Sequence, residues 1–205
     1  MMGPIRLRYL SLAVIGLAVA SAPGAIAQRS NPPMPRAQPL PRRNGTFTLR
    51  APDLLSRGRI AASHVYNGMG CSGQNISPSL EWFNAPAGTK SFAVTIYDPD
   101  APTGSGWWHW VMYNIPANTT SLAAGAGNGR NAPRGSVQGT TDFGTRGYGG
   151  PCPPAGDAPH HYHVKVFALK IDRIDAPGNA TAAFIGFNLN ANKLATAEII
   201  GRYGR

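Results

Sequence analysis

Four short apolar stretches decide which class of fold this 205-residue chain can adopt. SFAVTIY at Ser91–Tyr97 and YHVKVFAL within Tyr162–Ile171 follow the two-residue period of strands with a buried face. Thr46–Leu49 and Trp107–Ile115 are similar runs, and the segments between the four stretches are dense in Gly and Pro. The pattern predicts a mainly β protein with antiparallel strands.

One helix is expected late in the chain, from about Asn190 to Tyr203. Gly204 follows as a stop signal, and Gly201 favours an end about one turn earlier. The apolar residues that recur at helical spacing in this segment are Leu194, Ala197 and Ile200.

The first 27 residues have the composition of a secretory signal peptide. Arg6 and Arg8 precede the apolar run Leu10–Ala20, and Ala25–Ala27 forms an A-x-A cleavage pattern. The apolar run is shorter than the roughly 20 residues that a membrane anchor needs. We therefore expect residues 1–27 to be removed and the mature protein to be periplasmic or secreted.

Residues 28–43 would then form the mature N-terminus, with five prolines, four arginines and no acidic residue. A segment of this composition cannot bury a core and is expected to be disordered, before a single domain at 44–205. Six arginines lie in residues 1–43, so the domain keeps 13 basic against 9 acidic residues. The net charge of +10 therefore does not predict specific nucleic-acid binding, although the leader favours weak contact with anionic membrane lipid.

The chain has two cysteines, Cys71 and Cys152, both in loops rich in Gly and Pro. An oxidising compartment favours a disulfide between them over two free thiols. Neither belongs to a C-x-x-C pair, so the cysteines do not indicate a zinc site.

The stretch DPDAPTGSGWWHW, which begins at Asp98, combines a rigid acidic turn with an aromatic strand. Each proline fixes its own φ and restricts the residue before it, so Asp98 and Asp100 have little freedom. The pattern alone leaves a structural turn and an aimed carboxylate both open. Strand alternation predicts that one face carries Trp107, His109 and Val111, and the other Trp108 and Trp110.

A second cluster, GYGGPCPPAGDAPHHYH, runs from Gly147 to His163. Gly150 and the prolines after it could form a rigid backbone rim with inward N–H groups. Alternation then places His160 and Tyr162 on one face of the following strand and the other two histidines on the opposite face. A zinc site built from all of these histidines is therefore disfavoured.

With these motifs in view, the sequence resembles the phosphatidylethanolamine-binding protein (PEBP) family, also called the Raf kinase inhibitor protein family, and in particular its bacterial branch. The similarity runs from about residue 46 to 203. It is carried by YDPDAPTGSGWWHWVMYNIP, by TDFGTRGYGGPCPPAGDAPHHYHVKVFAL and by NANKLATAEI near the end.

The resemblance implies a β-sandwich with a large central antiparallel sheet, a smaller sheet and a C-terminal helix. It also implies a small pocket for phosphate or a phospholipid head group, with Trp107 in its wall. Many eukaryotic members have Arg where this chain has His161, so regulation of kinases is not carried over. The pocket residues that the resemblance implies are Asp98, His109, Gly150, Pro151, His160 and Tyr162.

The leading functional expectation is an exported binding protein without a cofactor, rather than an enzyme. The alternative from another class is an interaction protein that inhibits a kinase or protease through the pocket rim. A hydrolase using Asp98 and His109 as an acid–base pair is a third reading, but no activated nucleophile stands out. Bacterial members of the family often form dimers, so the resemblance also allows for a homodimer.

Overall fold

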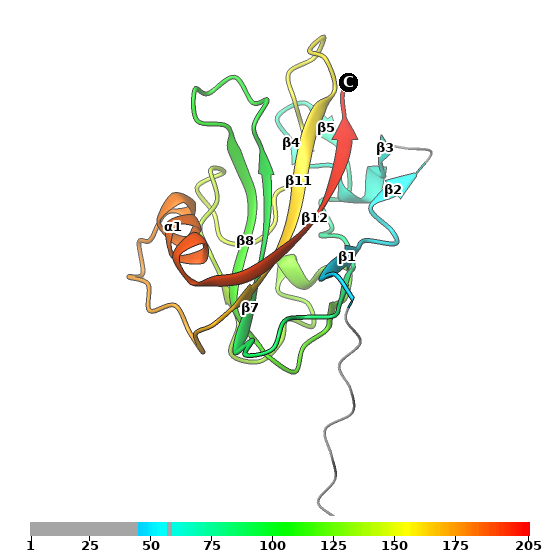
Figure 1. Ribbon diagram of the computed structural model, residues 1–205. Coiled ribbons are helices and arrows are strands. Elements are labelled where there is room, and N and C mark those ends of the chain that lie inside the picture. Colours follow the sequence, from blue (N-terminus) through cyan, green and yellow to red (C-terminus); the bar gives the residue numbers. More distant parts are fainter. Residues whose placement is uncertain (1–44, 57–58) are drawn as a thin grey trace, which may run out of the picture. The chain divides into compact units, whose positions relative to one another are not determined.

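The computed structural model describes residues 45–56 and 59–205, which form a two-layer β-sandwich with one α-helix (Figure 1). The fold class expected from the sequence is confirmed. The signal peptide (1–27) and the leader (28–43) lie outside the described residues and stay predictions.

The large sheet has five strands in the order β10-β8-β7-β11-β12, and every neighbouring pair is antiparallel. Its three central strands contain three of the apolar stretches that the sequence pattern identified. Their bounds are Ser91–Asp98 for β7, Trp107–Pro116 for β8, Val137–Gln138 for β10, His160–Leu169 for β11 and Lys193–Tyr203 for β12.

The small sheet has three strands, β1 (Thr48–Arg50), β6 (Leu80–Phe83) and β9 (Ser121–Leu122). A hydrophobic core lies between the two sheets and includes the fully buried Trp82 and Trp110. Two short ribbons complete the strands: β2 (Leu55–Ser56) with β3 (Arg59–Ile60), and β4 (Asn67–Gly68) with β5 (Cys71–Ser72).

The helix lies earlier than the sequence pattern indicated. α1 spans Ala182–Asn192, and β12 occupies most of the segment expected to be helical. β12 pairs with β11 along its whole length and buries alternate positions such as Ala197 and Gly201, so a strand period accounts for its buried residues. The helical spacing of Leu194, Ala197 and Ile200 was coincidental, because only Ala197 is buried and the other two side chains lie on the exposed face of the strand.

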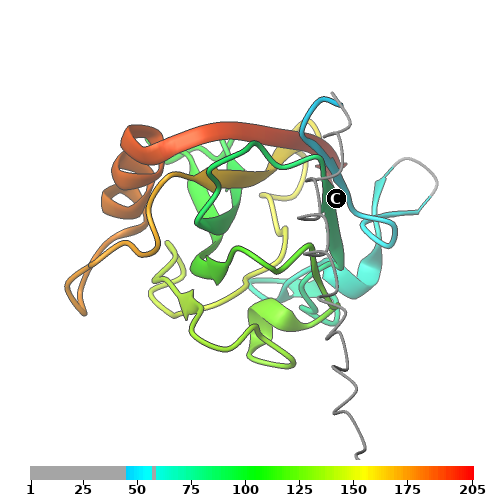
Figure 2. The ribbon, with the colours of Figure 1, turned by 60° about the horizontal axis from the view of Figure 1, so that its bottom comes forward.

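α1 packs on the face of the large sheet that points away from the small sheet (Figure 2). Its first turn is capped by Thr181, whose hydroxyl oxygen accepts a hydrogen bond from the backbone N–H of Phe184 at 3.1 Å. Among the described residues, no helix has the length and hydropathy required to cross a bilayer. The helix residues buried against the sheet are Ala182, Ile185 and Leu189.

A β-bulge in β8 changes the side-chain pattern that simple alternation predicts. Tyr97 pairs with Trp108 and Ile96 pairs with Trp110, which leaves His109 as an extra residue between them. Because one extra residue reverses the alternation from that point on, His109 and Trp110 both face the small sheet. The expected faces of Trp110 and Val111 are therefore wrong, since Val111 packs under α1.

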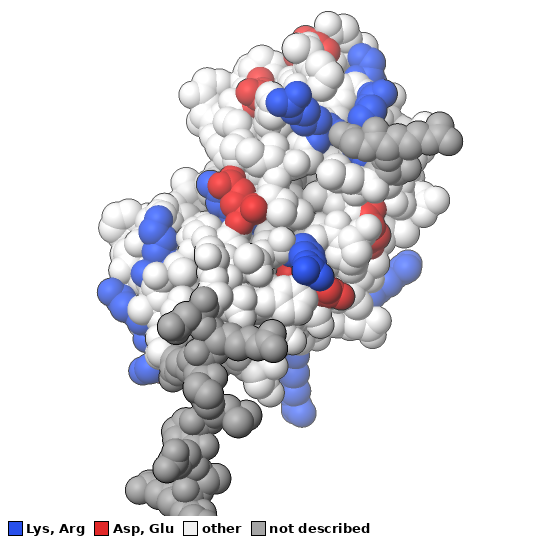
Figure 3. All heavy atoms as spheres, turned by 45° about the vertical axis from the view of Figure 1, so that its right-hand side comes forward, with Lys and Arg blue, Asp and Glu red and all other residues white. Residues whose placement is uncertain are grey.

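The surface charge of the described domain is mixed. On the face drawn in Figure 3, basic and acidic side chains are scattered singly or in small groups, without a continuous basic patch. This face offers no electrostatic track of the kind that nucleic-acid backbones require.

Candidate functional site

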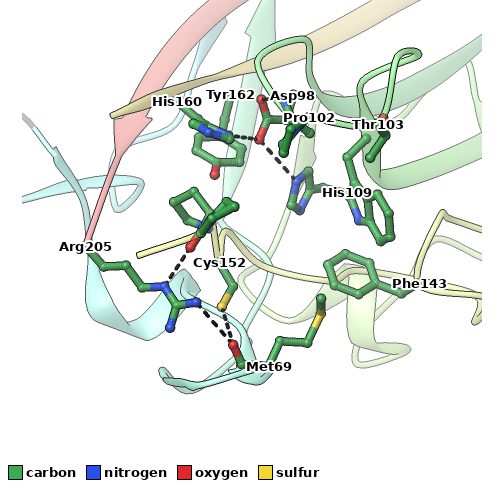
Figure 4. Close-up of a pocket in the computed structure, with 14 residues that line it drawn as sticks. Met69, Asp98, Pro102, Thr103, His109, Phe143, Cys152, His160, Tyr162 and Arg205 are labelled. Atoms are coloured by element: carbon green, nitrogen blue, oxygen red, sulfur yellow. Dashed lines mark hydrogen bonds and ion pairs between the residues drawn. The ribbon is translucent and has the colours of Figure 1, made fainter. Parts of the chain in front are cut away.

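A cavity of about 350 Å³ opens where the ends of β7, β8 and β11 meet the loop that contains Cys152 (Figure 4). We call it the main cavity. Its floor is polar and buried, formed by Asp98, His109, His160 and Tyr162, all below 5% exposure. The other residues that line it are Met69, Ala101, Pro102, Thr103, Trp107, Phe143, Cys152, Pro153, Pro154 and Arg205.

Asp98 ends β7 and is held by hydrogen bonds to both of its carboxylate oxygens. Oδ1 accepts from the backbone N–H groups of Asp100 at 2.8 Å and Ala101 at 3.2 Å. Oδ2 accepts from Nδ1–H of His160 at 2.8 Å. The rigid turn therefore does aim a carboxylate, and it aims it at the histidine of the second motif.

His109 is locked in one tautomer. Its Nδ1–H donates to the carbonyl oxygen of Gly149 at 2.8 Å, while Nε2 lies 3.9 Å from Oδ2 of Asp98. Burial lowers the pKa of His109 to about 4, although the Gly149 carbonyl and the Asp98 charge act in the opposite direction. At neutral pH two hydrogen-bond acceptors, Nε2 and a carboxylate oxygen, therefore face each other without a proton between them.

Tyr162 contributes a hydroxyl group that is buried and has no hydrogen-bond partner within residues 45–56 and 59–205. Burial and the nearby Asp98 charge raise the pKa of this phenol, so the group remains a proton donor. The Tyr162 ring packs edge-on against His109, with ring centroids 5.1 Å apart. An unpaired buried donor at the floor of a cavity is costly, and a guest with an acceptor oxygen removes that cost.

Gly150 and Pro151 do not line the main cavity, contrary to the sequence expectation. The N–H of Gly150 donates to Oδ1 of Asn75 at 2.7 Å, and the carbonyl oxygen of Pro151 accepts from Tyr66 at 3.1 Å. A Cβ atom at residue 150 would lie 2.1 Å from the carbonyl oxygen of His64, which explains the glycine. These residues seat the loop against its neighbours, and their backbone groups are already used.

The two other histidines of the second motif lie on the opposite face of β11, as alternation predicted. Both the backbone N–H and Nδ1–H of His161 donate to Oδ2 of Asp100, at 2.7 and 2.8 Å. Burial alone would raise the pKa of Asp100, but these hydrogen bonds outweigh it and the pKa is lowered. His163 pairs with Glu198 instead. The first and second motifs are thus joined on both faces of the sheet.

Sequence reasoning missed several side chains in the cavity wall, among them Phe143 and Arg205. Phe143 packs edge-on against Trp107 and His109, with ring centroids 5.3 and 5.5 Å away, and completes an aromatic wall. Arg205 reaches the wall from beyond β12. Phe143 belongs to the second motif and could have been considered there, whereas no local pattern points to Arg205.

The cysteines are joined, as the sequence analysis predicted. The Cys71–Cys152 disulfide links the β4–β5 ribbon to the loop that forms one wall of the main cavity, with Cα atoms 6.0 Å apart. The cavity wall therefore depends on a covalent link between segments 81 residues apart.

Comparison with known proteins identifies this arrangement. The family model described as phosphatidylethanolamine-binding protein matches residues 55–204. The chain belongs to the PEBP family. UPF0098 protein YbcL of Escherichia coli K12 is 54% identical over 159 residues, which cover 77% of this chain and 87% of that relative. UPF0098 protein YbhB of the same strain is 52% identical over 152 residues, 74% of this chain and 96% of that protein.

Solved structures of PEBP-family proteins share the fold. The crystal structure of E. coli YbcL, described as a new member of the mammalian PEBP family, matches with a TM-score of 0.76 at 53% identity and covers 78% of this chain and 99% of that chain. A PEBP homologue from Chlamydia trachomatis matches with a TM-score of 0.63 at 30% identity, covering 78% of this chain and 97% of that one. The family assignment from the two motifs is thus confirmed.

The low pKa of His109 predicts a loss of stability in mild acid. In the unfolded chain the imidazole binds a proton below about pH 6.5, whereas in the fold it does so only below about pH 4. Because the unfolded state then binds more protons, the free energy of unfolding falls by about 3 kcal/mol as pH decreases through this window. Urea titrations of wild type and His109→Gln between pH 4 and 7 test this prediction. If the free energy of unfolding depends on pH equally in the two proteins, the prediction is wrong.

Proposed function

We propose that this PEBP-family protein is an exported binding protein whose main cavity takes a phosphate-type anion, either free or as the head group of a phospholipid. The observation that carries the proposal is the unpartnered Tyr162 hydroxyl at the cavity floor, beside Asp98, His109 and His160. A phosphoryl oxygen is an acceptor of the kind that this donor lacks.

The floor also favours a guest that carries or acquires a proton. Nε2 of His109 and Oδ2 of Asp98 are both acceptors in the neutral-histidine state, 3.9 Å apart. A singly protonated phosphomonoester, whose second pKa is about 6, brings a hydroxyl that can donate into this gap. Alternatively, His109 takes up a proton when a fully ionised anion binds.

Two features of the chain support export. Residues 1–27 have the composition of a signal peptide, and Cys71 and Cys152 form a disulfide of the kind that persists in oxidising compartments. A fractionation experiment with the full-length gene product is expected to recover the protein outside the cytoplasm without residues 1–27.

Binding rather than catalysis is favoured by how the nucleophilic groups near the floor are occupied. Cys152 is in the disulfide, and the Thr103 hydroxyl donates to the carbonyl oxygen of Gly106 at 2.5 Å. Neither is positioned as a nucleophile activated by His109, which acyl or phosphoryl transfer through a covalent intermediate requires.

A protein partner at the cavity rim is the second candidate function. Met69, at 65% exposure, stands beside Pro153 and Pro154 and gives the mouth an apolar surface. A partner that binds this rim would be displaced by a phosphate ligand in the cavity and weakened by Met69→Ser. A partner insensitive to both would bind elsewhere.

Removing the Tyr162 hydroxyl is expected to have two effects: weaker anion binding and a more stable fold. Tyr162→Phe deletes a buried donor without a partner, so the free energy of unfolding should rise by about 1 kcal/mol or more. The same change removes a floor contact, so the affinity for inorganic phosphate and for O-phosphorylethanolamine should fall at least tenfold, or about 1.4 kcal/mol. Isothermal titration calorimetry measures both affinities.

Tyr148→Phe is the matched control, because the Tyr148 hydroxyl is buried outside the main cavity and donates to the carbonyl oxygen of His64 at 2.6 Å. It should destabilise the protein by about 1–3 kcal/mol while leaving anion affinity unchanged. If wild type and Tyr162→Phe bind the two ligands equally, or wild type binds neither, the proposed site is wrong.

A further inference from the structure

Arg205 is the one Lys or Arg side chain that lines the main cavity within the described part of the chain. Its guanidinium group donates three hydrogen bonds, all to backbone carbonyl oxygens: Nε to Pro153 at 2.6 Å, Nη1 to Gly70 at 2.9 Å and Nη2 to Met69 at 3.3 Å. Figure 4 shows the side chain crossing the base of the cavity wall toward Met69 and Cys152.

The charge of this guanidinium is not neutralised by a carboxylate. Arg205 has no ion pair among the described residues, and its three partners are neutral carbonyls. A guanidinium has five N–H donors and stays protonated at any physiological pH, so two donors and a full positive charge remain available. Burial keeps the imidazole of His109 neutral at neutral pH, so His109 supplies no comparable charge.

The same side chain also spans the gap that the disulfide closes. Gly70 and Met69 belong to the β4–β5 ribbon, whereas Pro153 follows Cys152 in the cavity loop. The backbone carbonyl of Arg205 accepts a hydrogen bond from the N–H of Gly156 at 3.2 Å, which ties the residue to that loop a second time. Arg205 thus holds the cavity wall in place and also gives it a positive charge.

We propose that Arg205 is the specificity-determining residue of the main cavity, which supplies the fixed positive charge that pairs with a bound phosphate-type anion. This inference rests on the proposed function. It predicts that ligands with two negative charges gain more from Arg205 than ligands with one, since Coulomb attraction scales with charge. It also predicts that the Arg205 contribution persists at pH 8, where His109 is neutral.

The test is calorimetric titration of O-phosphorylethanolamine and of inorganic phosphate at pH 8, in low and high salt. Arg205→Gln should lower the affinity for both ligands at least tenfold and make the remaining affinity less dependent on salt. Arg205→Lys should retain part of the affinity, because it keeps the charge but loses the three guanidinium hydrogen bonds to backbone carbonyls.

Arg59→Gln is the matched control. Arg59 donates to the carbonyl oxygen of Gly204 at 2.5 Å and lies over the Tyr203 ring at 5.8 Å, so it anchors the same tail but does not line the cavity. It removes the same net charge and should leave anion affinity within twofold of wild type.

Urea titration and the circular dichroism spectrum confirm that each variant is folded before affinity is compared. Equal affinity of wild type and Arg205→Gln would overturn the inference about Arg205 alone, provided that Tyr162→Phe still weakens binding at least tenfold. An equal loss in Arg59→Gln would overturn it too, since tail anchoring or net charge would then explain the effect. If wild type binds neither ligand, the proposed function fails and this inference fails with it.

Discussion

Replacing both cysteines with serine is expected to lower the free energy of unfolding by about 4 kcal/mol. The Cys71–Cys152 disulfide closes a loop of 81 residues, and in the chain-entropy model a loop of that length restricts the unfolded state by this amount. Urea denaturation of the Cys71→Ser/Cys152→Ser double variant measures the change. The midpoint should fall strongly, because the same folded contacts then compete with a less restricted unfolded chain.

Reduction provides an independent route to the same comparison. Wild type in excess dithiothreitol should approach the stability of the double variant, and dithiothreitol should not affect the double variant itself. A loss below about 1 kcal/mol in both experiments would show that the disulfide does not restrain the unfolded chain as argued. Cys152 also lines the main cavity, so the double variant should bind phosphate more weakly than wild type at the same temperature.

Affinity for a fully ionised anion is expected to fall about 100-fold between pH 5 and pH 7. Sulfate carries no proton in this range, so the proton that fills the gap between Asp98 and Nε2 of His109 must come from solvent. The pKa of His109 is about 4 in the free protein, so the protonated fraction falls about tenfold with each pH unit above it. Binding favours the protonated form, hence affinity increases as pH decreases.

Calorimetry in buffers with different ionisation enthalpies counts the protons directly. One proton should be taken up per sulfate bound at pH 6, and His109→Gln should abolish that uptake and flatten the pH profile. O-phosphorylethanolamine should show a shallower profile than sulfate, because its singly ionised phosphoryl group brings a proton of its own. A sulfate affinity independent of pH in wild type would rule out the proton-coupled floor.

Much of the site was predictable because two rigid motifs specify it locally. The prolines around Asp98 restrict the turn that aims the carboxylate, and the strand period after Pro159 separates His160 and Tyr162 from the other two histidines. The disulfide followed from cysteine count and compartment. Each of these inferences needed only short-range geometry or composition.

The wrong sequence predictions share a different cause, because the structure at those positions depends on residues distant in sequence. The bulge at His109 exists only because β8 pairs with β7 in a shifted register, and it exchanges the expected faces of Trp110 and Val111. Residues 193–203 form a strand because β11 offers them an edge. A local pattern cannot include either neighbour.

The same reasoning explains the two misjudged wall positions. Gly150 was expected to present its N–H to a ligand, but that group is satisfied by Asn75, which is 75 residues away. Arg205 carries no motif, and its role emerges only when β12 delivers it to the loop that contains Pro153. Side chains that reach a cavity from a chain segment without a motif are the ones that sequence patterns omit.

The most direct measurement is a crystal structure of the protein grown with O-phosphorylethanolamine at pH 5.5. We expect a phosphoryl group in the main cavity, with one oxygen at hydrogen-bond distance from the Tyr162 hydroxyl and another toward the Arg205 guanidinium. A phosphoryl group bound at any other place, with the Tyr162 hydroxyl still unpartnered, would contradict it.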